Sequence, residues 1–258
     1  MNIHIIGGGN LGVAIALGIS DFTTGNNVTV TRRNTESIAY LATKGIQIHS
    51  QNTHQIEAAD LIILTVKPYQ VDAVLEEIVP HLTHQVIASA VSGLAIESLL
   101  EKTKKKVPIV HMMPNIAIRF GQSATCVAFL EKDKQAAQNL LTLFNSLGTV
   151  AVIDEKLMDA ATVLGACGTA YALRYIRASM QAGIEIGFDA TTALAIASQT
   201  AKGAATMALE EQIHPEQLID RVTTPQGCTI VGLNEMEHEG FSSSLIKGIK
   251  ISLKKIKE

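Results

Sequence analysis

The sequence predicts an α/β fold in which an N-terminal doubly wound sheet is followed by an all-helical C-terminal domain. Over the first part of the chain, short β-rich runs alternate with helical patterns, as in a parallel sheet covered by helices on both faces. From Lys156 onward, long Ala-rich stretches with a helical period replace this alternation. We therefore expect one domain over residues 1–154 and a second over residues 155–258.

The predicted strands are short apolar runs. Residues 61–66 form a continuous, largely apolar run, as expected of a strand that is buried on both faces. The other strands are predicted at residues 2–6, 28–31, 85–90, 107–112, 123–129 and 149–152, with helices at 36–43, 71–79, 96–100 and 132–146. In the second domain, helices are predicted at residues 157–183, 190–211, 215–222, 230–239 and 242–257.

A glycine-rich segment joins the first predicted strand to the helical pattern that follows it. Its G-x-G-x-x-G pattern, in a strand–turn–helix context, is typical of a Rossmann-type dinucleotide-binding domain. Gly7 allows a tight turn, Gly9 lets the backbone approach a pyrophosphate, and Gly12 lets the helix pack closely on the strand. Unpaired N–H groups at the helix start then face the phosphates, although a glycine turn without a ligand is the alternative. The expected cofactor-binding residues here are Gly7, Gly8, Gly9, Asn10, Leu11 and Gly12.

The end of the second predicted strand indicates which dinucleotide binds. An acidic residue at this point would bind the ribose 2′-hydroxyl of NAD, but the chain has Thr31, Arg32, Arg33 and Asn34. Guanidinium groups suit a 2′-phosphate by charge and by bidentate geometry. Thr31, Arg32 and Arg33 therefore predict NADPH as the cofactor, with weaker binding of NADH. The alternative is that both arginines are ordinary surface residues.

Two further strand ends carry candidate ligand-binding residues, because ligands bind at the carboxyl ends of parallel strands. Val66 ends the apolar run at 61–66 and Lys67 and Pro68 follow it, so that Lys67 is placed to contact a cofactor ribose or phosphate. Asn115 follows the strand at 107–112, and its carboxamide suits a nicotinamide carboxamide or a substrate carbonyl. Each segment is equally compatible with a plain strand-end turn.

A hydroxyl-rich loop with Pro225 and Gly227 precedes a predicted helix near Ile230. Free backbone N–H groups at a helix start suit a carboxylate ligand. Thr229 lies at the mouth of this helix. Its hydroxyl can either cap the helix or contact a ligand, and the sequence leaves both open.

Composition narrows the class of protein. The net charge of −3 gives no basic footprint for nucleic acid, and the apolar runs are too short to span a bilayer. Cys126, Cys167 and Cys228 are widely spaced and include no C-x-x-C pair, so we expect no metal and a reducing cytoplasm, with no signal peptide before the first strand. Small and apolar residues on the long helices predict a homodimer or a larger homo-oligomer.

Several segments carry a family resemblance, in one order along the chain. They are IIGGGNLG at residues 5–12, VKP at 66–68, MPN at 113–115, HPEQL at 214–218, VTTPQGCT at 222–229 and EGF at 239–241. Together they resemble the pyrroline-5-carboxylate reductase family. The resemblance implies NAD(P)H-dependent reduction of the cyclic imine 1-pyrroline-5-carboxylate to L-proline, the last step of proline synthesis. It also implies a helical dimerisation domain and an active site where the two domains meet.

The same resemblance assigns roles in the late loop. It implies that backbone amides of this loop hold the carboxylate of the cyclic imine substrate, and that Thr229 is catalytic through a hydrogen bond to the imine nitrogen. The implied substrate-binding residues are Val222, Thr223, Thr224, Gln226, Gly227, Cys228 and Thr229.

Departures from the family pattern lie around the expected substrate pocket. GACGTAY at residues 165–171 stands where the family usually has SGSGPAY, and Gln226 and Cys228 replace a glycine and a small residue. His111 and Ile116 replace an arginine and a threonine. The alternatives are therefore a reductase of another cyclic imine, or a catalytically impaired NADPH-binding paralogue with a regulatory role. A β-hydroxy acid reductase is disfavoured, because its general-acid lysine has no counterpart between Lys156 and Arg174.

Overall fold

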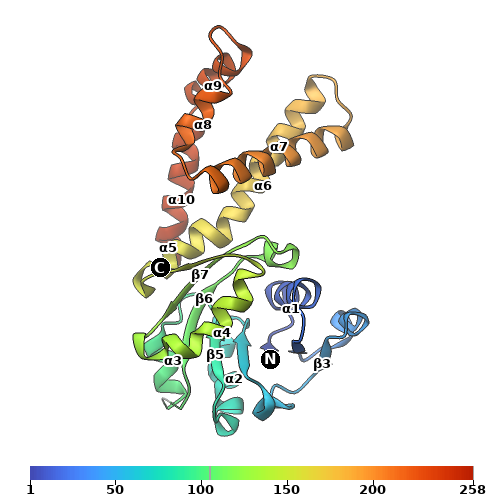
Figure 1. Ribbon diagram of the computed structural model, residues 1–258, viewed down its shortest axis with the longest axis vertical. Coiled ribbons are helices and arrows are strands. Elements are labelled where there is room, and N and C mark those ends of the chain that lie inside the picture. Colours follow the sequence, from blue (N-terminus) through green and yellow to red (C-terminus); the bar gives the residue numbers. More distant parts are fainter. Residues whose placement is uncertain (105, 258) are drawn as a thin grey trace. The chain divides into compact units, whose positions relative to one another are not determined.

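The computed structural model describes residues 1–104 and 106–257, except for the side chain of residue 257. By packing, the chain forms two compact units (Figure 1). One comprises Met1–Cys167 together with Ile256, and the other comprises Gly168–Lys255. The domain boundary at residue 154 stays a prediction, because packing alone assigns the turns between Glu155 and Cys167 to the first unit.

The first unit contains the predicted doubly wound sheet, which has eight strands among the described residues in the order β3-β2-β1-β4-β5-β6-β7-β8. The strands from β1 to β6 pair in parallel, whereas β7 is antiparallel to β6 and parallel to β8. Residues 114–122 connect β6 to β7, and a parallel crossover needs a longer connection. The strands are β1 (Asn2–Ile6), β2 (Asn27–Thr31), β3 (Gln47–His49), β4 (Leu61–Leu64), β5 (Val86–Ser89), β6 (Ile109–Met113), β7 (Ser123–Phe129) and β8 (Gly148–Val152).

Helices cover this sheet and link its strands. The α-helices of the unit are α1 (Asn10–Phe22), α2 (Val71–Ile78), α3 (Ile96–Lys102), α4 (Lys134–Asn145) and α5 (Met158–Ala161). The predicted helix at 36–43 is a 3₁₀-helix, η1 (Glu36–Lys44), which ends at Gly45 in the left-handed region. Shorter 3₁₀ turns are η2 (Ile56–Ala58), η3 (Pro68–Gln70), η4 (Val79–His81), η5 (Ile116–Phe120), η6 (Glu131–Asp133) and η7 (Glu155–Leu157).

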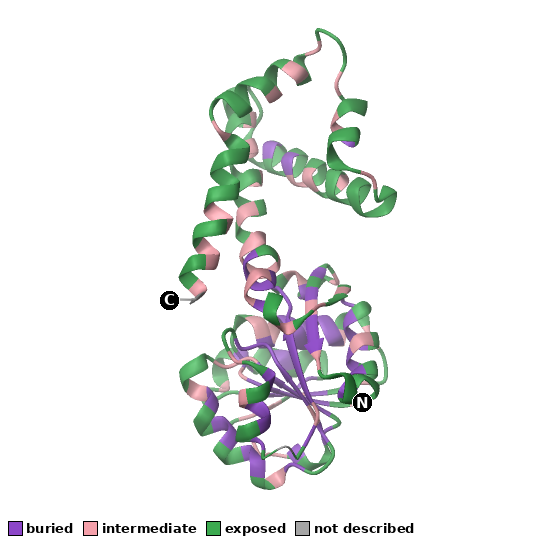
Figure 2. Cartoon of the chain, turned by 90° about the vertical axis from the view of Figure 1, so that its left-hand side faces the viewer, coloured by how far each residue is buried: buried purple, intermediate pink, exposed green. Residues whose placement is uncertain are grey.

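The hydrophobic core lies on both faces of the sheet (Figure 2, purple). Along β4 every residue is buried, and the side chains alternate between the two core clusters. Leu61 and Ile63 belong to one cluster, and Ile62 and Leu64 belong to the other. The apolar run is therefore a strand that is buried on both faces, as the sequence predicts.

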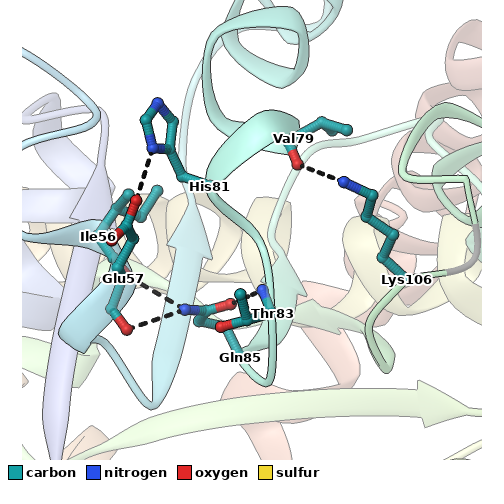
Figure 3. A network of polar contacts seen from close by, with 7 residues as sticks. All are labelled: Ile56, Glu57, Val79, His81, Thr83, Gln85 and Lys106. Atoms are coloured by element: carbon teal, nitrogen blue, oxygen red, sulfur yellow. Dashed lines mark hydrogen bonds and ion pairs between the residues drawn. The ribbon is translucent and has the colours of Figure 1, made fainter.

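A polar network fixes the amino ends of β4 and β5, at the sheet edge away from the glycine turn (Figure 3). The fully buried Gln85 donates to the carbonyl oxygens of Ile56 and Glu57, both at 3.3 Å, and accepts from the amide of Thr83 at 2.8 Å. His81 Nδ1 lies 2.9 Å from Glu57 Oε1. The Gln85 carboxamide is occupied by these bonds to backbone groups, so this end of the sheet has a structural role and not a ligand-binding one.

The second unit is helical. Its helices are α6 (Gly168–Glu185), α7 (Ala190–Glu211), α8 (Pro215–Arg221), α9 (Cys228–His238) and α10 (Phe241–Lys257). The stretch predicted as one helix at 157–183 is instead η7, α5, a π-helical segment (Thr162–Cys167) and α6. Helices α6 and α7 approach closely at small residues, because a Cβ on Gly183 would lie 3.0 Å from the Cβ of Ala193. None of the described helices has the length and hydropathy needed to cross a bilayer.

Candidate active site

The glycine turn after β1 needs its glycines for geometric reasons. Gly7 has φ +113°, and a Cβ there would lie 2.9 Å from the backbone and hydroxyl of Thr65. A Cβ on Gly12 would overlap the carbonyl oxygen of Gly7. These contacts confirm the turn role of Gly7 and the packing role of Gly12. A Cβ on Gly9 would meet nothing within 4 Å, so the backbone there faces open space.

The ends of β2 and β4 hold the turn in place. The carbonyl oxygen of Thr31 accepts from the amides of Gly7 at 3.1 Å and Gly8 at 3.0 Å. Thr65 Oγ1 donates to the carbonyl oxygen of Gly7 at 2.7 Å. The turn is thus fixed by neighbouring strands before any ligand binds, which is the preorganisation that a phosphate-binding loop needs.

A pocket of about 590 Å³ opens beside this turn, at the carboxyl ends of β1, β2 and β4. It brings together, from the expected cofactor-binding residues, Gly7, Gly8, Gly9, Thr31, Arg32, Arg33, Val66 and Lys67. Sequence reasoning missed several other lining residues, which include Ser50, Gln51, Asn52, Gln70 and Glu77. The three after β3 were missed because the short strand Gln47–His49 carries no clear apolar run.

Charge and hydrogen bonding organise the wall of this pocket. Among the described residues that line the pocket, Arg32, Arg33 and Lys67 outnumber the acid Glu77, so the lining favours an anionic ligand. Asn52 is oriented from both sides. Its Oδ1 accepts from Thr31 Oγ1 at 2.7 Å, and its Nδ2 donates to Glu77 Oε2 at 2.9 Å.

A second pocket of about 420 Å³ lies next to the first and shares Gly8, Gly9 and Arg32 with it. Asn10 lines this second pocket, together with Ser37, Tyr40, Arg119 and Phe120. The remaining expected cofactor-binding residues, Leu11, Gly12, Pro68 and Asn115, line neither of the two pockets.

Asn115 is already engaged within the first unit. Its Oδ1 accepts from the amide of Ala117 at 3.0 Å and caps η5, while its Nδ2 donates to the carbonyl oxygen of Gly165 at 3.2 Å. The carboxamide keeps one further donor and one further acceptor position, so a ligand role is compatible with these bonds. Gly165 belongs to the π-helical segment, where the sequence departs from the family pattern.

His4, a buried histidine of β1, interacts with Asn52 in the segment after β3. Burial lowers the pKa of His4 to about 4, against a backbone hydrogen bond to Asn52 that raises it, and the nearby His54 and His49 lower it further. The rings of His49 and His54 stack with centroids 3.8 Å apart. His4 is therefore neutral at pH 7, and its Nε2 is buried without a partner among the described residues.

The late loop lies in the second unit and ends at α9, which begins at Cys228 rather than near Ile230. Gly227 occupies the N-cap position without a side-chain cap, and Thr229 is exposed inside the first turn. The capping role for Thr229 is therefore wrong in this structure. The amide of Gly227 donates to the carbonyl oxygen of Thr224 at 2.9 Å, and Gln226 adopts φ 60°. The first amides of α9 have no intrahelical partner and face away from the helix body.

Two family models match separate parts of the chain. The model described as pyrroline-5-carboxylate reductase dimerisation matches residues 155–258. The model described as NADP oxidoreductase coenzyme F420-dependent matches residues 2–93. The two matches cover the helical and the glycine-turn regions respectively.

Curated relatives match over the whole chain. Pyrroline-5-carboxylate reductase 2 of Dictyostelium discoideum is 44% identical over 98% of this chain and 91% of its own length. Pyrroline-5-carboxylate reductase 1 of the same organism is 44% identical, and here the match covers 97% of this chain but only 48% of the relative. The pyrroline-5-carboxylate reductase of Aquifex aeolicus is 31% identical over 100% of this chain and 97% of its own length.

Solved structures agree with this likeness. Pyrroline carboxylate reductase of Plasmodium falciparum, crystallised with NADP bound, is 26% identical, with a TM-score of 0.88 over 100% of this chain and 97% of that chain. The pyrroline-5-carboxylate reductase of Coxiella burnetii is 27% identical, with a TM-score of 0.88 over 99% of this chain and 97% of that chain.

Proposed function

The chain belongs to the pyrroline-5-carboxylate reductase family, and we propose that it reduces 1-pyrroline-5-carboxylate to L-proline with NADPH. One observation carries the proposal. The 44% identity to the second Dictyostelium reductase extends over 98% of this chain. The preformed glycine turn and the cationic pocket beside it support the same conclusion, because both suit a phosphorylated dinucleotide.

The first unit would hold NADPH. Amides at the glycine turn and the start of α1 suit the diphosphate, and the open space at Gly9 leaves room for it. Arg32 and Arg33 give the β2 end of the pocket the positive charge that a 2′-phosphate requires, and Lys67 offers a further positive charge. Beyond the residues that line the pocket, including Val66, we extend the cofactor site to Leu11, Gly12, Pro68 and Asn115, as the sequence pattern predicts. When bound, NADPH supplies the hydride.

The loop at residues 222–229 would hold the substrate. Its free amides at the start of α9 and the positive end of that helix suit the substrate carboxylate. Thr229 is exposed and its hydroxyl has no hydrogen-bond partner among the described residues, so it is available to the imine nitrogen. A protonated imine needs little acid–base assistance before it accepts a hydride. The residues of this chain therefore act by holding and orienting the substrate.

The helical unit would also form the contact between copies of the chain. The family model for dimerisation matches residues 155–258 and supports a homo-oligomer. We propose a homodimer as its basic form, because many large apolar side chains of the helices are exposed in the single chain. Cys126, Cys167 and Cys228 form no disulfide among the described residues, which suits a reducing compartment such as the cytoplasm.

An activity assay tests the proposed reaction. NADPH oxidation is followed with 1-pyrroline-5-carboxylate and with a panel of cyclic imines that differ in ring size and carboxylate position. We expect the highest kcat/KM with 1-pyrroline-5-carboxylate. A higher kcat/KM with another imine would make that imine the substrate, and the departures at Gln226 and Cys228 would then be the first positions to test for the change in specificity. Binding of NADPH without turnover of any imine would favour the regulatory paralogue.

A further inference from the structure

We propose that the two adjacent arginines divide the work of cofactor recognition: Arg33 reads the 2′-phosphate, whereas Arg32 braces the glycine turn. The inference rests on the proposed function in one respect, namely that the larger pocket holds NADPH. It goes beyond the sequence, which presents the two guanidinium groups as equivalent.

Arg32 is committed to the glycine turn through both backbone and side chain. Its amide donates to the carbonyl oxygen of His49 at 3.1 Å, which ties the residue to β3. Its Nη1 donates to the carbonyl oxygen of Gly8 at 2.7 Å. A Cβ on Gly8 would lie 3.1 Å from the Cβ of Arg32 and 3.3 Å from its Cδ, so the aliphatic stem lies along the turn.

The bond to Gly8 has an electrostatic consequence for any anion at the turn. A backbone carbonyl oxygen carries partial negative charge and repels a phosphate oxygen. The guanidinium of Arg32 neutralises the carbonyl of Gly8, which lines both pockets. Because NADPH and NADH share the diphosphate, this contribution favours the two cofactors equally.

Arg33 has no such commitment. It is exposed, it lines the larger pocket but not the smaller one, and no hydrogen bond or ion pair engages its side chain among the described residues. All five N–H donors of its guanidinium are thus available to a ligand. A phosphate can take two of them in a bidentate contact without breaking a bond within the protein.

The acid in the same pocket leaves this charge available. Glu77 Oε2 accepts from Asn52 Nδ2 at 2.9 Å, and no ion pair joins Glu77 to either arginine among the described residues. Lys67 is the other cation in the pocket, but it follows β4 rather than β2. Arg33 therefore combines the β2-end position that distinguishes NADP from NAD with an unengaged guanidinium.

Calorimetric titration of the full chain tests the division, with each arginine serving as the matched control for the other. The ligands are NADPH, NADH and 2′,5′-ADP. For Arg33→Ala we expect NADPH and 2′,5′-ADP to bind about 10- to 100-fold more weakly, and NADH to bind within about 3-fold of the wild type. For Arg32→Ala we expect NADPH and NADH to weaken by similar factors, so that their ratio of Kd values is kept. We expect Arg32→Lys, which keeps the positive charge and N–H donors but loses the planar guanidinium, to restore part of the affinity that Arg32→Ala loses.

The outcomes separate this inference from the proposed function. If Arg32→Ala lowers NADPH affinity alone, or if Lys67→Ala rather than Arg33→Ala removes the selectivity, the division is wrong while NADPH binding stands. If the wild type binds NADPH no more tightly than NADH, both the division and the proposed cofactor preference fall. Should Arg32→Ala not fold, the ratio of Kd values in Arg33→Ala and Arg32→Lys still decides between the two arginines.

Discussion

The two units of this protein bury their apolar side chains in different ways. In Met1–Cys167 the sheet has a buried cluster on each face, and residues such as Ile5, Ile63 and Phe144 are 0% exposed. In Gly168–Lys255 the buried apolar residues, among those described, are Ala193, Ala197 and Leu218 (Figure 2, mainly green in α6 to α10). The first unit completes its own core, and the second does not.

The difference shows that the helices of the second unit leave an apolar surface that the unit does not bury by itself. Large apolar side chains on its helices are exposed, namely Leu173, Ile186, Leu209, Val231, Ile246 and Ile251. Burying one such side chain contributes about 1.5–3 kcal/mol. A second copy of the chain that covered several of these side chains would add to the stability that the unit obtains alone, which agrees with the family match to a dimerisation domain.

The largest expected effect is loss of the oligomer when a charge is placed on the exposed apolar surface of the helical unit. Leu209, on α7, is 65% exposed in the single chain. If a partner copy covers it, Leu209→Asp buries an unpaired charge and should convert the oligomer to monomer at micromolar concentration, as seen by sedimentation. Tyr69→Glu is the control, because Tyr69 in the first unit is 85% exposed and should tolerate the charge. An unchanged sedimentation coefficient for Leu209→Asp would place this residue outside the interface.

The second effect is an acid sensitivity that belongs to the first unit. The pKa of His4 is lowered to about 4, so the folded unit binds fewer protons there than the unfolded chain between about pH 6.5 and pH 4. Its contribution of about 3 kcal/mol is present above pH 6.5 and is lost as the pH falls toward 4. Denaturant unfolding across this range should show a shallower pH dependence in His4→Gln. His238→Gln, which alters an exposed residue of the second unit, should leave the slope as in the wild type.

The third prediction concerns Thr229. A lost hydrogen bond to a charged imine is worth about 1.5–3 kcal/mol, so Thr229→Ala should lower kcat/KM for 1-pyrroline-5-carboxylate about 10- to 150-fold. NADPH affinity should stay nearly unchanged, because the proposed cofactor residues lie in the first unit. Thr206→Ala is the matched control, since that hydroxyl donates to the carbonyl oxygen of Lys202 on the exposed helix α7. A normal kcat/KM in Thr229→Ala would rule out the catalytic role.

The smallest effect compares one strained backbone position in each unit. Gln226 has φ 60° and Gln55 has φ 55°, a region that a residue with a Cβ occupies at a cost. Replacement by glycine relieves that cost but adds entropy to the unfolded chain, which leaves a gain of about 0.5 kcal/mol at either site. The midpoint temperature of thermal unfolding should rise slightly for both variants. Only Gln226→Gly should also change KM for the imine. An equal KM in both variants would show that Gln226 takes no part in substrate binding.

Local sequence determined the parts of this protein that depend on neighbours along the chain. The glycine pattern fixed the strand–turn–helix, because a missing Cβ has the same consequence wherever the turn occurs. The apolar run at β4 identified a strand buried on both faces, since its alternation feeds both clusters. Helical periodicity located α7 to α10 within a few residues, but it merged η7, α5, the π-helical segment and α6 into one helix.

Only the tertiary structure decided what depends on residues far apart in sequence. β7 pairs antiparallel with β6, whereas the strands from β1 to β6 pair in parallel, and Asn52 Nδ2 meets Glu77 Oε2 at 2.9 Å beside the larger pocket. Arg32 and Arg33 are adjacent and chemically identical in the sequence. They differ because the carbonyl oxygen of Gly8 lies 2.7 Å from Arg32 Nη1, whereas Arg33 lines the pocket and its side chain is unpaired among the described residues. The partner of a hydrogen bond between residues far apart in sequence is set by the fold, and the sequence around either residue does not identify it.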